Sequence, residues 1–327
     1  MLSRVADSIY WMCRYIERAE SISRFIDVNL HLMLDLPVNH EQWEPLVITT
    51  GDQALFAERY GEPTQRNVIR FLAFDPAYPS SVLSCVRAAR ENGRSVRDSI
   101  SSEMWEALNG FYHLVNDANR DSAALEEPHR FFTEVRRASH LFKGVTDSTM
   151  TRSEGWHFAR MGRLLERADK TSRILDVKYY ILLPRTVDVG APYDNIQWAA
   201  LLKSASALEM YRKRFGRIAP SNVAAFLLFD REFPRAIHYS LIYAENSLHA
   251  ITGSPWGSFQ NEAEMHLGRL RSELDYTRID DVISSGLHEY LDNLQGRLNA
   301  VGDAIFNTFF ALRPAPAGDA RGQAQFA

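Results

Sequence analysis

Hydrophobic residues recur at helical spacing along most of the chain. In residues 4–34, apolar side chains such as Ile16, Ala19 and Ile26 return to one face of a helix. The same pattern, interrupted by proline and glycine, predicts further helices at 46–60, 65–74, 81–92, 94–120, 130–149, 155–182, 196–215, 221–229, 234–252, 258–277 and 280–312. Because β-branched residues never alternate over the length of a strand, we expect no β-hairpin. The pattern therefore predicts an all-α fold.

Two segments of the chain recur in the same order. Residues 9–28 align without gaps with residues 158–177, and nine of the twenty positions are identical. A second block, Phe71-Leu72-Ala73-Phe74-Asp75, matches Phe226-Leu227-Leu228-Phe229-Asp230 at nearly the same separation. Two blocks in one order at similar separations are difficult to produce by chance, so they indicate an internal duplication.

The duplication predicts a helical bundle formed from two related halves, residues 1–150 and residues 151–313. A period near 150 residues is too long for a solenoid unit, so we expect two subdomains related by a pseudo-twofold axis, with the two long helices at its centre. Residues 314–327 are rich in alanine, glycine, proline and glutamine, which is typical of a disordered tail.

Composition and charge exclude several classes of function. The net charge is -4, without the basic excess of most nucleic-acid binders. Cys13 and Cys85 are too few for a disulfide framework, and no paired-cysteine zinc motif occurs. No signal peptide and no run of 18 apolar residues is present, so we expect no membrane span and a cytoplasmic location. Arginine strongly outnumbers lysine, which suits carboxylate or phosphate recognition but also fits a bias in genomic base composition.

Both long helices carry the pattern Arg-x-x-Glu-Arg-Ala-acid. Arg14 and Glu17, like Arg163 and Glu166, are three residues apart and can meet on a helix surface opposite the apolar stripe. The pattern fits either salt bridges that brace a duplicated interface or a polar cleft for an acidic ligand. In the second case Glu17 or Glu166 could act as a general base if burial raised its pKa. The candidate ligand-binding arginines are Arg14, Arg18, Arg24, Arg163, Arg167 and Arg173.

Four further residues are candidates for ligand binding. Asp75 and Asp230 precede proline-containing turns, where they either cap a helix or reach the same cleft. Trp156 and His157 stand at the start of the second long helix.

The spacing Glu154-x-x-His157 is that of di-metal carboxylate bundles, but such sites need the motif twice. Because it occurs once, we expect no metal ligands and no cofactor. No glycine-rich phosphate loop occurs either, so any nucleotide would bind to another chain.

The opening Met1-Leu2-Ser3-Arg4-Val5-Ala6-Asp7-Ser8-Ile9-Tyr10-Trp11-Met12 and its continuation Arg14-Tyr15-Ile16-Glu17-Arg18-Ala19-Glu20 closely resemble the start of the bacterial alpha-E domain family. Gly155-Trp156-His157-Phe158 through Gly162-Arg163-Leu164-Leu165-Glu166-Arg167-Ala168-Asp169 is similar to the second signature of that family. The resemblance implies an all-helical protein. It also implies two partners, because genes of this family commonly lie beside those for a circularly permuted ATP-grasp ligase and a transglutaminase-like protein.

Three functions follow from these features. The first is a component of an ATP-grasp-associated system that forms or modifies peptide or amide bonds and binds a carboxylate- or phosphate-bearing ligand in an Arg/Glu-lined cleft. The second is a non-catalytic helical scaffold or binding module, since no complete catalytic constellation occurs. The third is a carboxylate-bridged metal oxidase. The sequence leaves open whether the chain is an enzyme, which substrate it uses and whether it forms a homo-oligomer.

Overall fold

A computed structural model describes residues 1–35, 43–121, 123–182 and 192–311. Within these ranges the secondary structure is helical and contains no strand, which confirms the predicted all-α class. Their helices include none that is both long enough and apolar enough to cross a bilayer. The predicted tail at 314–327 lies outside the described residues.

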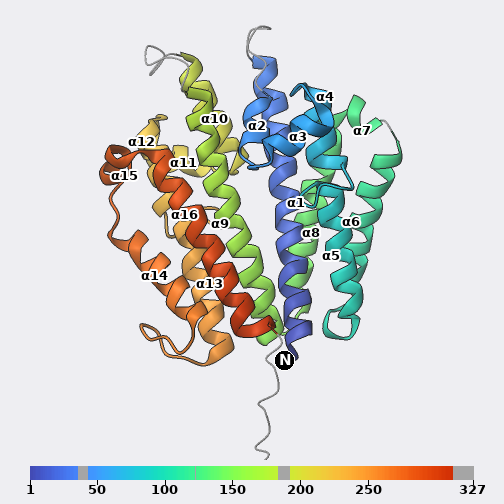
Figure 1. The fold of residues 1–327 in the computed structure, drawn as a ribbon, viewed down its shortest axis with the longest axis vertical. Helices are drawn as coiled ribbons and strands as arrows, with labels where there is room; N and C mark the ends of the chain where they lie inside the picture. Colours follow the sequence, from blue (N-terminus) through green and yellow to red (C-terminus); the bar gives the residue numbers. More distant parts are fainter. Residues whose placement is uncertain (36–42, 122, 183–191, 312–327) are drawn as a thin grey trace, which may run out of the picture.

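Two long helices pack against each other at the centre of the molecule: α1 (Ser3–Asp35) and α9 (Glu154–Leu182). They are the central blue and green helices of Figure 1. Gly162 allows their close approach, because a Cβ atom there would lie 2.5 Å from the carbonyl oxygen of Tyr10. Most of the residues of α1 and α9 whose burial is described are buried or partly buried.

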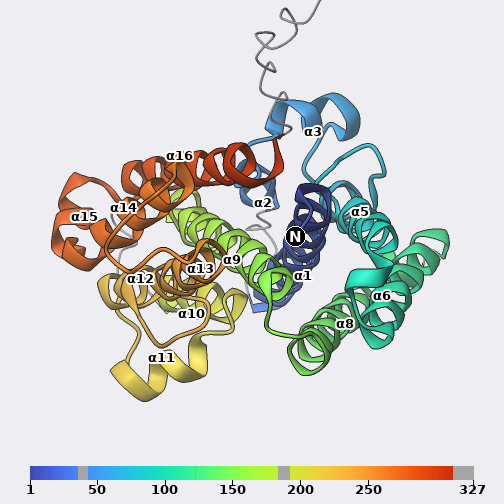
Figure 2. The same ribbon diagram turned by 90° about the horizontal axis from the view of Figure 1, so that it is seen from below.

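Three helices complete a four-helix group with each central helix. The group around α1 contains α5 (Val82–Ser95), α6 (Ser102–Arg120) and α8 (Pro128–Thr149). The group around α9 contains α13 (Ile237–Thr252), α14 (Glu262–Tyr276) and α16 (Leu287–Ile305). Seen from below, the two groups flank the α1–α9 pair (Figure 2). Buried apolar side chains from both groups belong to one connected core.

Shorter helices connect the long ones, and many gather at the upper end of the bundle in Figure 1. On the first half they are α2 (Glu44–Ile48), α3 (Gln53–Tyr60), α4 (Gln65–Ile69), the π-helix η2 (Arg70–Phe74), the 3-10 helix η3 (Arg97–Ser99) and α7 (Ala123–Glu126). On the second half they are α10 (Pro192–Ser204), α11 (Leu208–Phe215), α12 (Pro220–Phe229), α15 (Ile279–Ser285) and the π-helix η5 (Phe306–Phe310).

Several predicted helices are divided by backbone that a helix cannot accommodate. The helix predicted at 46–60 is interrupted at Gly51, whose φ is +80°. The helix predicted at 196–215 breaks at Ser206, where φ is +52°. α6 begins later than expected because the Ser101 hydroxyl accepts a hydrogen bond from the Met104 backbone N–H and caps the helix there.

Two kinds of polar contact occur once in each half. Arg59 forms an ion pair with Asp75, and Arg214 forms one with Asp230, at the same sequence separation of 16. Near the starts of α8 and α16, the Nδ1 atom of His129 lies 2.6 Å from Asp27, and that of His288 lies 2.8 Å from Asp176. These recurrences support the predicted duplication, which remains a prediction together with its division at residue 150.

Candidate functional site

The two Glu-Arg dipeptides of the central helices form ion pairs that cross between α1 and α9. Glu166 accepts hydrogen bonds from Arg14 Nε at 2.9 Å and from Arg18 Nε and Nη2 at 2.6 and 3.0 Å. In return, Glu17 accepts from Arg167 Nε and Nη2 at 2.9 and 3.0 Å. The expected pairs within each helix, Arg14 with Glu17 and Arg163 with Glu166, are not among the ion pairs of the described residues. The motif therefore joins the two helices.

The carboxylates of these pairs are shielded from water. Glu17 and Glu166 each expose 0% of their surface, so they do not lie on a solvated face opposite the core. Burial disfavours their charge, but neighbouring cations outweigh it. Arg167 and Lys143 hold the pKa of Glu17 well below its ordinary range, and Arg18 and Arg14 lower the pKa of Glu166 to about 2. A carboxylate held ionised in this way is a weak base, which disfavours a general-base role.

Each crossed carboxylate belongs to a larger group of charges. We call the group around Glu17 the first charge cluster; its members are Glu17, Glu20, Arg24, Lys143, Arg167 and Arg235. We call the group around Glu166 the second charge cluster; its members are Arg14, Arg18, Glu166, Asp169, Lys170 and Arg173. Each contains four cations and two carboxylates, so positive charge is in excess in both.

The first charge cluster is filled by side chains from other elements. Lys143 of α8 contacts both carboxylates and lies 2.6 Å from Glu17, and Arg235 likewise contacts Glu17 and Glu20. Arg24 donates a hydrogen bond to Glu20 at 2.7 Å. Burial lowers the pKa of both Lys143 and Arg235 despite the two carboxylates. Arg24 and Arg167, both candidates from the sequence, therefore lie inside a packed ionic core.

The second charge cluster borders a cavity of about 220 Å³, which we call the charged cavity. Arg14 and Arg18 of α1 line it together with Lys170 and Arg173 of α9. The other polar and apolar lining residues are Ser21, Ile22, Phe25, Thr49, Thr50, Asp52, Tyr78, Ser80, Asp169, Ile174 and Asn299. Glu166 does not line the cavity; it holds Arg14 and Arg18 from behind. Three of the predicted arginines thus meet at one recess.

The cations around the charged cavity retain hydrogen-bonding capacity. Arg14 and Arg18 use Nε and one further nitrogen each, which leaves Arg14 Nη2 and Arg18 Nη1 with no hydrogen bond to any described residue. Lys170 donates to Asp169 at 2.8 Å with one of its three N–H groups. Arg173 is fixed more fully, by Asp169 and by the carbonyl oxygen of Thr49 at 3.0 Å. A ligand with acidic oxygens would find oriented donors here.

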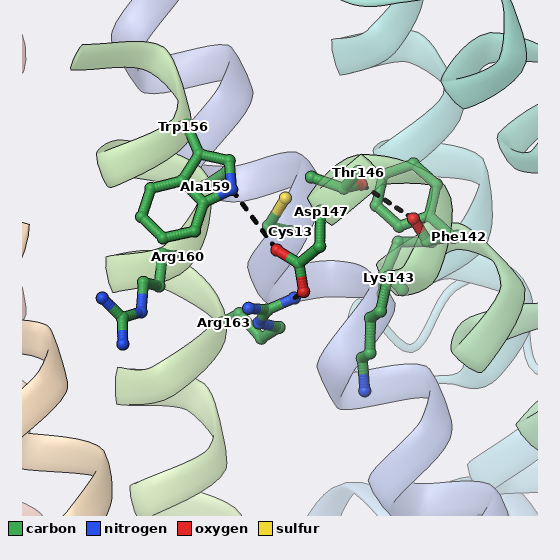
Figure 3. A pocket seen from close by; sticks show the side chains of 10 residues that line it. Cys13, Phe142, Lys143, Thr146, Asp147, Trp156, Ala159, Arg160 and Arg163 are labelled. Atoms are coloured by element: carbon green, nitrogen blue, oxygen red, sulfur yellow. Dashed lines mark hydrogen bonds and ion pairs between the residues drawn. The ribbon is translucent and has the colours of Figure 1, made fainter. Parts of the chain in front are cut away.

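Trp156 and Arg163 lie at a different place, around a pocket of only about 10 Å³ (Figure 3). Trp156 Nε1 donates to Asp147 at 3.3 Å, and Arg163 Nη1 lies 3.7 Å from the same carboxylate. Arg152 and Arg160 stack on the Trp156 ring. A space of this size holds about one water molecule, so these residues join α8 to α9 and do not form part of the charged cavity.

Glu154 and His157 do not form a shared site. Glu154 pairs with the amino group of Met1 at 2.6 Å. His157 stacks at its ring edge on Trp156, and burial, helped by nearby Arg160, lowers its pKa. Cys13 is buried, which raises the pKa of its thiol to about 12 and makes it a poor nucleophile.

Asp75 and Asp230 each accept hydrogen bonds from backbone N–H groups of the turn that directly follows them. Asp75 accepts the backbone N–H of Ala77, and Asp230 accepts those of Glu232 and Phe233, at 2.7–2.9 Å. With the ion pairs described above, these bonds fix the turn that follows each aspartate. Neither aspartate lines the charged cavity.

One group that the sequence did not single out could hold a metal ion. Ligand atoms of Asp27, His31 and His129 lie within 4.8 Å of one another near the end of α1. However, Arg136 already contacts the second oxygen of Asp27 at 2.7 Å, and its charge would oppose a cation. The Asp–His contact also recurs in the other half, where it joins α9 to α16.

Sequence reasoning also missed most of the cavity wall. Asp52, Tyr78 and Ser80 are distant in sequence from Asp169 and Lys170 of α9, and only tertiary structure brings these two groups together. Lys170 carried the one usable signal, since it is a rare lysine that directly follows the repeated motif.

The Glu-Arg dipeptides of the two central helices correspond to the conserved motif by which a known protein family is described. The model of the family named Alpha-E, described as a predicted alpha-helical domain with a conserved ER motif, matches residues 1–310. The chain belongs to the Alpha-E family. In this Alpha-E chain, the Glu-Arg dipeptides at 17–18 and 166–167 supply the crossed ion pairs.

Three relatives of this chain are longer than it is. The chain is 24% identical to an uncharacterized protein of Mycobacterium bovis and to uncharacterized proteins of two Mycobacterium tuberculosis strains. Each alignment covers 94% of this chain and 37% of the relative, so the Alpha-E chain spans little more than a third of their length. No solved structure matches it.

Proposed function

We propose that this Alpha-E protein binds a carboxylate- or phosphate-bearing ligand in the charged cavity. The observation that carries the proposal is the convergence of Arg14, Arg18, Lys170 and Arg173 on one cavity. Arginine and lysine donors of this kind suit acidic oxygens, and two of the arginines keep nitrogen atoms without a partner in the described part of the chain. Their orientation is set from behind by Glu166, which supports binding at little further cost in ordering.

We further propose that binding serves an ATP-grasp-associated system that forms or modifies peptide or amide bonds. The support is the family resemblance, together with the acidic intermediates of such chemistry, which proceeds through an acyl phosphate. In this account the chain acts in the cytoplasm as a component of the system, beside a circularly permuted ATP-grasp ligase and a transglutaminase-like protein. Glu17 and Glu166 position arginines and do not exchange protons with the ligand.

The test measures ADP release by the partner ligase with and without this chain. We expect the chain to stimulate release, and Lys170→Met to reduce the stimulation at least tenfold, which corresponds to about 1.4 kcal/mol. Lys203→Met is the matched control, because Lys203 is exposed on α10 and does not line the charged cavity. Equal ADP release with and without the wild-type chain would contradict the role in the ligase system.

A second candidate is the non-catalytic scaffold, favoured by the full burial of both crossed carboxylates. It predicts that Lys170→Met behaves like the control in the ligase assay and that substitutions in either charge cluster change stability alone. The metal oxidase has less support, since Glu154 and His157 have separate partners.

A further inference from the structure

The charged cavity has a counterpart in the other half of the molecule that is filled by protein. The contacts that recur in both halves allow the two places to be compared. The Asp27–His129 and Asp176–His288 contacts align α8 with α16, and the Arg59–Asp75 and Arg214–Asp230 pairs align the turns that follow. Within this alignment, the first and second charge clusters occupy equivalent positions.

Two basic residues of the first charge cluster correspond to small residues at the charged cavity. Lys143 follows His129 by fourteen positions, and Gly302 follows His288 by the same number. Arg235 follows Asp230 by five positions, as Ser80 follows Asp75. Ser80 lines the charged cavity. Gly302 is not one of its lining residues but lies beside it, because a Cβ atom on Gly302 would have Nη1 of the lining residue Arg14 as a neighbour at 3.7 Å. The cavity therefore lies where one lysine and one arginine side chain would otherwise lie.

Because small residues stand at these two positions, the Asp169 carboxylate of the second charge cluster has fewer hydrogen-bond donors than Glu20 of the first. In the first cluster, Glu20 receives Arg24, Lys143 and Arg235, together with the Ser139 hydroxyl at 3.3 Å. Among the described residues, its counterpart Asp169 accepts side-chain hydrogen bonds from Lys170 and Arg173 only.

Asp169 is also accessible from the charged cavity. Its side chain is 11% exposed, whereas that of Glu20 is 0% exposed, and Asp169 lines the cavity. Glu166, by contrast, is fully buried behind Arg14 and Arg18 and does not line the cavity, so it is not available to a ligand there.

We propose that the ligand of the charged cavity is zwitterionic, with an ammonium or guanidinium group that donates to Asp169 and an acidic group that binds Arg14 and Arg18. This inference rests on the proposed function and names its ligand class: an amino acid, or a peptide end or side chain of like charge. The basic group takes the place that Lys143 and Arg235 fill in the other half. The acidic group accepts hydrogen bonds from the unpartnered nitrogens of Arg14 and Arg18.

Size and charge both suit such a ligand. At about 220 Å³ the cavity is smaller than the roughly 300–1,000 Å³ of sites for drug-sized molecules. The second charge cluster has two more cations than carboxylates, and Asp52, which lines the cavity and accepts a hydrogen bond from the Tyr78 hydroxyl at 2.7 Å, adds one negative charge. The remaining net positive charge favours a ligand that is neutral overall or carries one negative charge.

The experiment compares two probes that differ only in the amino group, glutamate and glutarate, by calorimetric titration of the full chain. We expect wild type to bind glutamate at least tenfold more tightly than glutarate, and Asp169→Asn to remove most of this preference by weakening glutamate alone. Gly302→Lys, which introduces the residue of the filled half, should abolish binding of both probes. Gly296→Lys on the same helix should change neither, because a Cβ atom there meets no atom within 4 Å and Gly296 does not line the cavity.

The outcomes separate the two proposals. Equal affinity of wild type for glutamate and glutarate, or a preference that persists in Asp169→Asn, would overturn the zwitterion but leave an anion site in place. Absence of binding by both probes, or binding that survives Gly302→Lys, would overturn the charged cavity as the site. Gly302→Lys keeps the test decisive even if Asp169→Asn fails to fold.

Discussion

Glu166→Gln should strongly destabilise the protein at neutral pH. Glutamine keeps the shape of the side chain but removes the charge that neutralises Arg14 and Arg18, and Glu166 is fully buried between α1 and α9. The drop in the pKa of Glu166 from 4.5 to about 2 corresponds to roughly 3 kcal/mol of stabilisation by its surroundings. Loss of one partner from a buried ion pair costs a similar amount, about 3–5 kcal/mol.

The stabilisation by Glu166 should depend on pH. A carboxylate whose pKa is lowered in the folded state stabilises the fold above its unfolded pKa, and this contribution disappears as the pH falls toward the folded value. The difference in unfolding free energy between wild type and Glu166→Gln should therefore be about 3 kcal/mol at pH 7 and shrink between roughly pH 4.5 and pH 2. Other carboxylates occur in both proteins and largely cancel.

Urea denaturation followed by circular dichroism measures this difference across the pH range. Glu106→Gln on the exposed side of α6 is the control and should change stability by less than about 0.5 kcal/mol. If Glu166→Gln were as stable as wild type at pH 7, or if the loss were the same at pH 3, the crossed ion pairs would not stabilise the α1–α9 contact as described.

Three further results follow from the packing of the central helices and from the charges around them. Gly162→Ala should lower the unfolding free energy by about 1–3 kcal/mol, because its Cβ atom would meet the Tyr10 carbonyl oxygen. Gly144→Ala, in open space on α8, is the control and should be neutral or slightly stabilising. Equal melting temperatures for the two variants would contradict the close approach of α1 and α9. Cys13 and Cys85 should resist a thiol reagent at pH 8 until the protein unfolds, since burial raises both pKa values to about 12, and rapid labelling of the native protein would refute this. Glu17→Gln should destabilise the fold at pH 7 at least as much as Glu166→Gln, because it leaves Arg167, Lys143 and Arg235 with one counterion fewer. A milder effect in the same urea assay would argue against the first charge cluster as an ionic core.

The sequence predicted the helical class and the central position of the repeated motif, because helical periodicity is a local property. It also identified the arginines that meet at the charged cavity. It misplaced the carboxylates: helical geometry put Glu17 and Glu166 on a polar face, but each central helix is packed on several sides, so that face is buried against the other long helix.

The remaining features depend on contacts between distant segments. Lys143 and Arg235 carry no local signal, and their role emerges only where α8 and the turn after Asp230 meet α1. The charged cavity depends on Gly302 and Ser80. These two small residues stand where the first charge cluster has Lys143 and Arg235, so they leave space that larger side chains would occupy. Sequence patterns reveal which side chains share a helix face but not which spaces other elements leave open.

The most direct test of the central claim is ADP release by the partner ligase in the presence of Gly302→Lys and Gly296→Lys variants of this chain. Both changes add one lysine to α16, but only the first begins next to a residue of the charged cavity, Arg14, whereas a Cβ atom on Gly296 meets nothing within 4 Å. We predict that wild type and Gly296→Lys stimulate ADP release equally, while Gly302→Lys, folded to the same extent, does not stimulate it. Full stimulation by Gly302→Lys would show that the charged cavity is not the functional site.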